Sequence, residues 1–271
     1  MKIPFTVLLL YVLIFPSAIA QRTHSFSAGI GTIYYYGDLT DRFNNSLLRP
    51  AFNVSYSRYI IPGVSFRVGL SGGEIGASDG MAIEYTRQVR NLHFRSPIYE
   101  ASGCLVYEIL QDKDFGTYVG KPHISPYVFA GVAFFRFNPK ARYNGVWYDL
   151  RDLGTEGQFI PGHTPGPYAL TQAAVPFGIG VNIRLASYTG LNMEVGYRTT
   201  MTDYLDDVST VYPDFEQLAE VNGSLATELS ERSPDNRFKP GEIRGNPNAN
   251  DGYFFTAISV VYYLSRFATR D

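Results

Sequence analysis

Several long segments of this chain alternate between apolar residues and small or polar residues, and this period of two most constrains the fold. The clearest case is 175–185, where one face is apolar and the other carries glycines, an amide and a charge. The apolar face comprises Val175, Phe177, Ile179, Val181, Ile183 and Leu185, and the opposite face comprises Pro176, Gly178, Gly180, Asn182 and Arg184. The pattern predicts β-strands. A face that mixes glycines with charges favours the narrow lumen of a barrel over a water-facing sheet.

Most of the predicted strands are long enough to cross a membrane, which takes about 9–11 tilted residues. We place the strands at 25–36, 49–60, 64–74, 92–110, 125–138, 170–186, 190–203 and 252–265. Their connections alternate in length. The turns at 61–63 and 186–190 are tight, the segment 111–124 is intermediate, and the connections at 75–91, 139–169 and 204–251 are long.

This sorting of connections is typical of outer-membrane barrels, in which short turns are periplasmic and long loops are extracellular. A soluble β-sandwich has no reason to sort its loops in this way. We therefore predict an all-β fold for 21–271, an eight-stranded antiparallel transmembrane β-barrel with long extracellular loops and short periplasmic turns. Helical spacing of apolar residues predicts a short amphipathic helix within 213–232, and 79–91 could hold another.

The first twenty residues have a different composition from the rest of the chain. Lys2 precedes an apolar run from Phe5 to Phe15, and Ala18-Ile19-Ala20 supplies small residues for cleavage. This pattern predicts a signal peptide over 1–20. The alternative, a membrane-anchoring helix, is disfavoured because the run is short. We predict export, cleavage after Ala20, and localisation in the outer membrane of a Gram-negative cell, in contact with its lipid.

Composition excludes two classes of protein. The formal net charge of −2 gives no basic footprint for nucleic acid. The single cysteine, Cys104, cannot form an internal disulfide. It lies in an alternating apolar segment, where a buried structural thiol is a better interpretation than a nucleophile.

Two groups of residues are candidates for chemistry. His93 lies at the loop-side end of a predicted strand, but its possible partners Ser96 and Glu100 are on the same segment and their spacing enforces no triad. We predict no enzymatic activity, no catalytic residue and no cofactor.

A loop acidic cluster is formed by Asp203, Asp206 and Asp207, with Asp38 and Asp41 close by if the first loop folds over it. Carboxylates bind hard cations such as calcium, but this spacing is not that of a calcium loop. Aspartates at strand ends are also common in turns. Turn chemistry is therefore the preferred interpretation, and metal binding is the weaker alternative.

The predicted lumen carries charges of both signs. These residues are Arg67, Glu100, Glu108, Arg184, Glu194 and Arg198. A barrel of eight strands is only wide enough to be filled by its own side chains. Unpaired charges inside would be costly. We therefore expect an internal network of ion pairs and hydrogen bonds that plugs the lumen, which argues against a porin.

Five stretches carry a resemblance to a known family. They are Asn91-Leu92-His93-Phe94-Arg95-Ser96-Pro97-Ile98-Tyr99-Glu100, 125–139, 153–158, 175–180, and Tyr197-Arg198-Thr199-Thr200-Met201-Thr202-Asp203-Tyr204-Leu205-Asp206-Asp207-Val208-Ser209. Together they resemble the PorG-type outer-membrane barrels associated with type IX secretion and gliding motility.

The resemblance implies a role and partners. It implies a non-catalytic barrel that anchors a periplasmic ring complex, formed by a lipoprotein and its partner, through periplasmic segments such as 111–124 and 266–271. The family also includes barrels of unassigned role. The alternative is therefore a general barrel whose long loops bind an extracellular ligand or stabilise the membrane.

Overall fold

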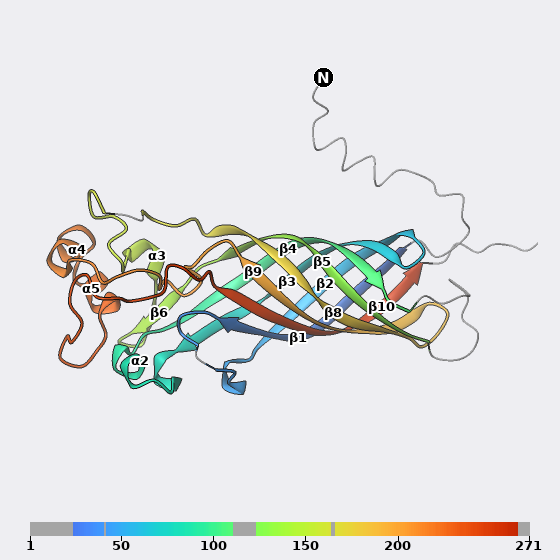
Figure 1. Ribbon diagram of the computed structural model, residues 1–271, viewed down its shortest axis with the longest axis horizontal. Helices are drawn as coiled ribbons and strands as arrows, with labels where there is room; N and C mark the ends of the chain where they lie inside the picture. The colour runs from blue at the N-terminus through green and yellow to red at the C-terminus, as the bar shows by residue number, and fades with distance from the viewer. Residues whose placement is uncertain (1–23, 41, 111–122, 164–165, 265–271) are drawn as a thin grey trace, which may run out of the picture.

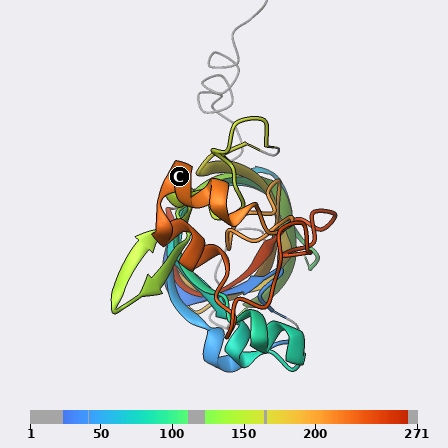
Figure 2. The same ribbon diagram turned by 90° about the vertical axis from the view of Figure 1, so that its left-hand side faces the viewer.

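The computed structural model describes residues 24–40, 42–110, 123–163 and 166–264. Eight of its strands form a closed antiparallel barrel (Figures 1 and 2). They are β1 (His24–Tyr36), β2 (Arg49–Ile61), β3 (Val64–Ser78), β4 (His93–Glu108), β5 (His123–Phe137), β8 (Thr171–Arg184), β9 (Thr189–Thr200) and β10 (Gly252–Leu264). Each strand pairs with its neighbour along the chain, β5 pairs with β8, and β10 closes the ring on β1. The predicted eight-stranded barrel is confirmed.

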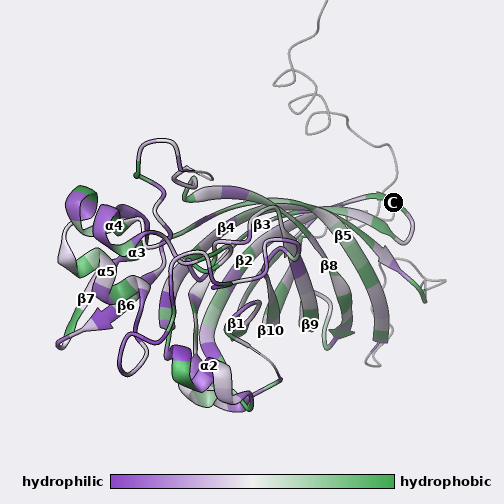
Figure 3. Ribbon diagram, turned by 60° about the vertical axis from the view of Figure 1, so that its left-hand side comes forward, coloured by the Kyte–Doolittle hydropathy of each residue, from purple (hydrophilic) through white to green (hydrophobic). Residues whose placement is uncertain are grey.

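The alternation in the sequence becomes an inside and an outside of the wall. Apolar residues point outward, as Ile30 does with 76% of its surface exposed, whereas Tyr127 points into the lumen and is 1% exposed. Figure 3 shows the bands of hydrophobic residues along the barrel strands. The outer surface is therefore apolar over the middle of the strands, as a lipid-facing wall requires.

Glycines on the lumen face make room for large rings. A Cβ atom at Gly180 would lie 2.6 Å from Cε1 of Tyr127, and one at Gly178 would lie 2.8 Å from Cε1 of Phe129. A Cβ at Gly196 would also crowd Phe129, at 2.7 Å from its Cζ. The glycines of β8 and β9 thus give the rings of β5 the space that they fill.

The long connections gather at one end of the barrel (Figure 1). This end, the loop side, carries η1 (Asn45–Leu47), η2 (Asp79–Met81), α2 (Tyr85–Arg90), β6 (Lys140–Tyr143), β7 (Val146–Asp149), α3 (Leu150–Leu153), α4 (Phe215–Asn222) and α5 (Ser224–Ser230). We call the described residues of 37–48, 79–92, 138–170 and 201–251 the loop crown. The helix predicted within 213–232 is present as two pieces, which break at Gly223 with φ of 82°. The hairpin of β6 and β7 was not predicted.

The opposite end, the turn side, holds the tight connections 62–63 and 185–188. Three predictions concern residues outside the described ranges: the signal peptide over 1–20, most of the segment 111–124, and the segment 266–271. In the part of the chain that is described, no helix has the length and apolar character needed to cross a membrane.

The largest apolar core lies at the loop-side end of the barrel. It joins lumen-facing residues of several strands to the crown, among them Ile33, Ile75, Ile98, Phe135 and Leu205. Each of these five side chains is 1% exposed or less. The crown is therefore packed onto the barrel as a continuation of its interior.

Candidate functional site

The middle of the lumen holds an ion pair between β3 and β9. Arg67 Nη1 lies 2.6 Å from Glu194 Oε2, and Tyr127 donates its hydroxyl hydrogen to the same oxygen at 2.7 Å. The guanidinium of Arg67 also lies 4.8 Å from the centre of the Phe129 ring. The charge of Glu194 is thus matched by a cation and by a neutral donor, as a buried carboxylate requires.

A second ion pair lies nearer the loop side. Arg198 Nε donates to Glu100 Oε2 at 3.1 Å, and its Nη2 donates to Oε1 at 3.3 Å. Tyr253 donates to Glu100 Oε2 at 2.6 Å, and Ser71 donates to Oε1 at 3.2 Å. This two-pronged pair, with further donors on the carboxylate, is the arrangement that offsets the cost of burying both charges.

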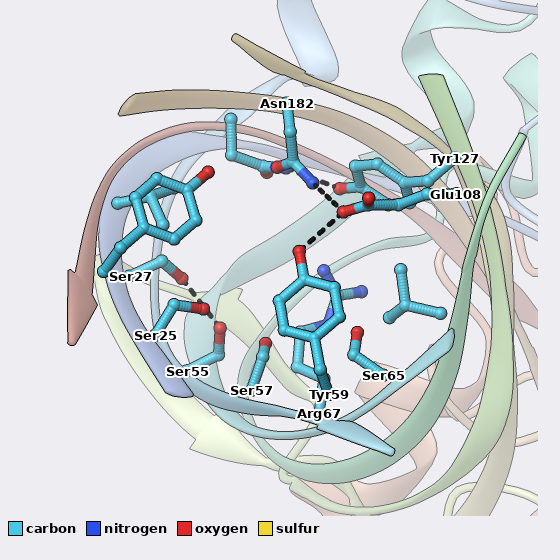
Figure 4. A pocket seen from close by; sticks show the side chains of 14 residues that line it. Ser25, Ser27, Ser55, Ser57, Tyr59, Ser65, Arg67, Glu108, Tyr127 and Asn182 are labelled. Atoms are coloured by element: carbon cyan, nitrogen blue, oxygen red, sulfur yellow. Dashed lines mark hydrogen bonds between the residues drawn. The ribbon is translucent and has the colours of Figure 1, made fainter. Parts of the chain in front are cut away.

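Glu108 and Arg184 behave differently from the other four lumen charges. Glu108 Oε1 accepts hydrogen bonds from Tyr59 at 2.7 Å and from Asn182 at 3.4 Å (Figure 4). Among the ion pairs of the described residues, none includes Glu108. Arg184 donates to the carbonyls of Ala186 and Ser187 in the turn. The six predicted lumen residues therefore form two ion pairs, one hydrogen-bonded acid and one turn contact.

Two small polar cavities remain in the lumen. The one on the turn side measures about 40 Å³ and is shown in Figure 4. Five serines line it together with Glu108: Ser25, Ser27, Ser55, Ser57 and Ser65. The second measures about 30 Å³ and lies between the two ion pairs, and Arg67 lines both. Volumes of this size hold roughly two to four waters each. Above them, the apolar core closes the loop-side end.

Carboxylates gather where the crown meets the barrel. The hydroxyl of Tyr35 lies 2.5 Å from Asp206 Oδ2 and 3.0 Å from Asp251 Oδ1. A phenol has one hydrogen, so the two contacts together require a second proton, carried by one of the carboxyls. Burial, and then repulsion from Asp251, raises the pKa of Asp206 well above its usual range. Burial, and then repulsion from Asp203, does the same to the pKa of Asp251.

The other members of the predicted acidic cluster have separate surroundings. Burial raises the pKa of Asp203 to about 8. Asp207 accepts a hydrogen bond from Tyr168 at 2.7 Å and another from Thr155, and burial raises its pKa to about 6. Asp38 accepts from the backbone of Asn246 at 2.8 Å. Asp41 lies outside the described residues.

The carboxylates of the crown do not converge on one point. Within the described ranges, no group of three or more His, Cys, Asp or Glu side chains is arranged to hold a metal ion. Two of them instead accept backbone hydrogen bonds: Asp206 Oδ1 from Val208 N at 2.9 Å, and Asp251 Oδ2 from Leu205 N at 2.9 Å. The arrangement joins loops to the barrel.

Sequence reasoning missed the crown's other buried ion pairs. Arg244 Nη1 donates to Glu156 Oε1 at 2.9 Å and to the carbonyl of Asp207 at 2.5 Å. Arg90 donates to both oxygens of Asp79, at 2.7 and 2.8 Å. The sequence held one signal for the contacts of Arg244: Glu156 and Asp207 lie in two of the stretches that carry the family resemblance, 153–158 and 197–209.

His93 has a structural contact in place of a catalytic one. Its Nε2 accepts from the backbone of Arg142 at 3.0 Å, and its ring stands edge-on to Trp147. Ser96 accepts from the backbone of Asn138, and Glu100 pairs with Arg198. Because successive residues of a strand alternate in direction, His93 points to the opposite face from Ser96 and Glu100. His93 fastens the β6–β7 hairpin to β4.

Cys104 is a free, buried thiol in the lumen wall. Its backbone lies close to Gly131 of β5, where a Cβ atom would come within 2.7 Å of the Cys104 Cα. The thiol packs with Val106, Tyr127 and Phe129.

Comparisons with known proteins give the following similarities. The outer membrane protein OprG of Pseudomonas aeruginosa is 8% identical, with 91% of this chain and 99% of that chain covered and a TM-score of 0.44. Ail, the attachment invasion locus protein of Yersinia pestis, is 9% identical, with 90% and 98% covered and a TM-score of 0.41. The N-terminal β-barrel domain of Pseudomonas aeruginosa OprF is 9% identical, with 90% and 98% covered and a TM-score of 0.38.

Sequence comparisons give one match. No curated protein matches the chain. A family model described as a domain of unknown function (DUF6089) matches residues 4–268.

Proposed function

We propose that this chain, which belongs to the DUF6089 family of domains of unknown function, is a non-catalytic outer-membrane β-barrel that acts as a closed scaffold and conducts no solute. The filled lumen carries this proposal. Two ion pairs, Arg67–Glu194 and Arg198–Glu100, cross it. The remaining cavities of about 40 and 30 Å³ are too small for a solute pathway.

The membrane location is supported by the barrel's outer surface. Apolar side chains such as Phe134 on β5 and Ile179 on β8 are 64% exposed. A contiguous apolar surface of this extent is typical of a membrane-facing wall. With the turn side in the periplasm, the loop crown faces outward, as in other barrels of this class.

The specific role that we propose is a component of the type IX secretion and gliding machinery. In this role, the barrel anchors a periplasmic ring complex, including a lipoprotein, to the outer membrane. The support is the resemblance of five stretches to PorG-type barrels, together with a rigid lumen that suits an anchor. A barrel filled by paired side chains resists deformation, so a load applied at the turn side reaches the membrane.

Conductance tests the closed scaffold. The purified protein in planar bilayers should give no stepwise current, because the ion pairs and the apolar core block the lumen. The double variant Arg67→Ala/Glu194→Ala is the matched comparison, since it removes one pair and enlarges both cavities. Steady single-channel currents from the unaltered protein, at any voltage that the bilayer tolerates, would contradict the closed scaffold.

Deletion of the gene tests the secretion role. The deletion strain should lose secretion of type IX cargo, and the tagged barrel should co-purify with the ring lipoprotein from detergent extracts. An unrelated small barrel, tagged in the same way, controls for general membrane capture. Normal secretion in the deletion strain would reject this role and leave the closed scaffold standing.

A second function, binding of an extracellular ligand, is favoured by the internal order of the crown. The crown has its own buried ion pair, Arg244–Glu156, and a small core of Ile160, Leu218 and Ala226. Replacing 211–250 with a short Gly/Ser linker should leave barrel assembly intact. If secretion survives this change but the strain loses another surface property, the loop function is favoured over the anchor.

A further inference from the structure

Two neighbouring loops of the crown expose large apolar side chains. Phe43 is 66% exposed, Ile83 is 62%, Tyr85 is 69% and Met81 is 45%. We call these four residues the lateral patch. Other apolar residues of the same loops, such as Leu47, are buried. These loops can therefore bury apolar side chains, and they leave these four outside.

The two loops dock on one another. The side-chain amide of Asn44 lies 3.8 Å from the sulfur of Met81. The ring of Phe43 packs on Tyr34 of β1 at a centroid distance of 5.0 Å, and the Tyr34 hydroxyl donates to the carbonyl of Arg42 at 2.8 Å. The lateral patch is thus tied to the barrel wall.

The patch lies beside the barrel. Figure 1 shows η1 and α2 hanging next to the loop-side end of the strands, and Figure 2, which looks down the barrel, shows both outside the ring of strands. The helices α4 and α5 lie instead at the far end of the crown (Figure 1). Residues beside the wall can reach the surface of the membrane that the wall crosses.

The patch continues the apolar outer wall. By alternation Tyr34 points outward from β1, yet it is only 4% exposed, and the ring of Phe43 packs against it. Further down the outer face, Ile30 on β1 and Phe52 on β2 pair side by side and are exposed. The apolar outer face of β1 thus resumes at Tyr34 and Phe43, beyond the hydrogen-bonded pair of Thr32 and Thr256.

The edge of the patch carries positive charge. Arg42 and Arg49 flank the first loop and are exposed. Aromatic side chains beside arginines are typical of the boundary between acyl chains and headgroups, where rings sit in the interface and guanidinium groups meet anionic headgroups.

We propose that the lateral patch inserts into the headgroup region of the outer leaflet and that lipid covers it. This inference rests on the proposed membrane location. It makes the first two loops a lateral foot of the barrel, whereas the far crown stays in water. The foot would fix the height and tilt of the barrel in the leaflet, in the way that interfacial aromatic residues anchor membrane spans.

Tryptophan fluorescence in lipid nanodiscs tests the foot. The chain has a single tryptophan, so Trp147→Phe gives a dark background. Phe43→Trp and Tyr85→Trp are the reporters. Phe134→Trp, on the outer wall of β5, is the positive control, and Val221→Trp, on α4 at the far crown, is the water-exposed control. Each is measured in nanodiscs with brominated or unbrominated phosphatidylcholine.

The expected result is a several-fold loss of emission for both reporters with bromine near the headgroup, and less quenching with bromine near the chain end. Val221→Trp should be unaffected. If both reporters behave like Val221→Trp while Phe134→Trp is quenched, the foot is wrong and the membrane location stands. If Phe134→Trp is not quenched either, the membrane location itself fails. Shielding of the reporters without bromine quenching would indicate a protein partner and would also overturn the foot.

Discussion

The lumen and the base of the crown both bury carboxylates, but they neutralise them differently. In the lumen, Glu194 and Glu100 each face an arginine. At the base of the crown, Asp206 and Asp251 face one another across the hydroxyl of Tyr35. A guanidinium is charged at every pH that a protein meets, whereas a shared proton depends on the solution. The ion pairs of the lumen should therefore keep their strength as pH changes. The contact between barrel and crown at Tyr35, Asp206 and Asp251, which we call the joint, should instead depend on pH.

The strongest test of this difference removes one arginine from the lumen. Arg198→Met leaves Glu100 buried without its cation, which should destabilise the barrel by about 3–5 kcal/mol. Urea unfolding in detergent, followed by tryptophan fluorescence and by heat-modified gel mobility, measures it. The double variant Arg198→Met/Glu100→Gln should recover part of the loss. Equal stability of Arg198→Met and the unaltered protein would mean that the pair does not hold the lumen.

The matching change at the joint is Tyr35→Phe. It removes the hydroxyl between Asp206 and Asp251 and should cost about 1–3 kcal/mol, because two buried carboxyls lose a partner. The loss should be local, so a protease should cut the crown faster while the barrel's unfolding midpoint changes less. Tyr36→Phe is the control, since the neighbouring Tyr36 is exposed. A uniform loss over barrel and crown would show that the two regions unfold as one.

Alkaline pH should loosen the joint. Burial raises the pKa of Asp206 and of Asp251, and that of Asp203 to about 8, so folding takes up protons. Stability from these groups is complete below the ordinary carboxyl pKa and is lost as pH rises through the raised values. Proteolysis of the crown should therefore accelerate as pH rises from about 4 through 8 and beyond. Asp206→Asn, which imitates the protonated acid, should weaken this dependence; an unchanged profile argues against the shared proton.

The smallest effect is expected at Glu108. Its side chain accepts hydrogen bonds from Tyr59 and Asn182. Glu108→Gln keeps an acceptor and removes only the charge, so the unfolding free energy should change by about 1 kcal/mol or less. The same urea titration measures this change and compares it with that of Glu194→Gln. The second variant leaves Arg67 without its carboxylate partner and should lower the unfolding free energy more. A loss at Glu108 as large as at Glu194 would reveal a third ion pair.

The strands of the barrel wall were predictable from the sequence, but the partners of the charged side chains in the lumen were less predictable. Period-two alternation located all eight strands, because a membrane-facing wall imposes a side-chain direction on every residue. The partner of Arg67 is Glu194, which is far away along the chain. This pairing depends on which strands face one another across the lumen, and the alternation does not reveal that. Arg184 shares the lumen alternation but lies at the strand end, where the turn carbonyls capture it.

The crown shows what periodicity cannot reveal. Its ion pairs join residues that no repeat relates, such as Glu156 and Arg244. The β6–β7 hairpin did leave a signal, because Asn144-Gly145 is a typical two-residue hairpin turn. Both residues have positive φ, 47° and 87°. The length of the connection 139–169 hid this signal.

The pairing of β1 with β10 has a consequence for biogenesis. The first strand, β1, pairs with the last strand, β10, from His24 opposite Leu264 to Tyr36 opposite Gly252. This pairing cannot form until the end of the chain has been added to the barrel. Until β10 arrives, β1 presents an open edge that invites pairing with another chain. Contacts of such long sequence separation form slowly. An assembly factor that shields the edge of β1 would have to do so until β10 pairs with it. The proton between Tyr35, Asp206 and Asp251 would be enclosed only at that last step.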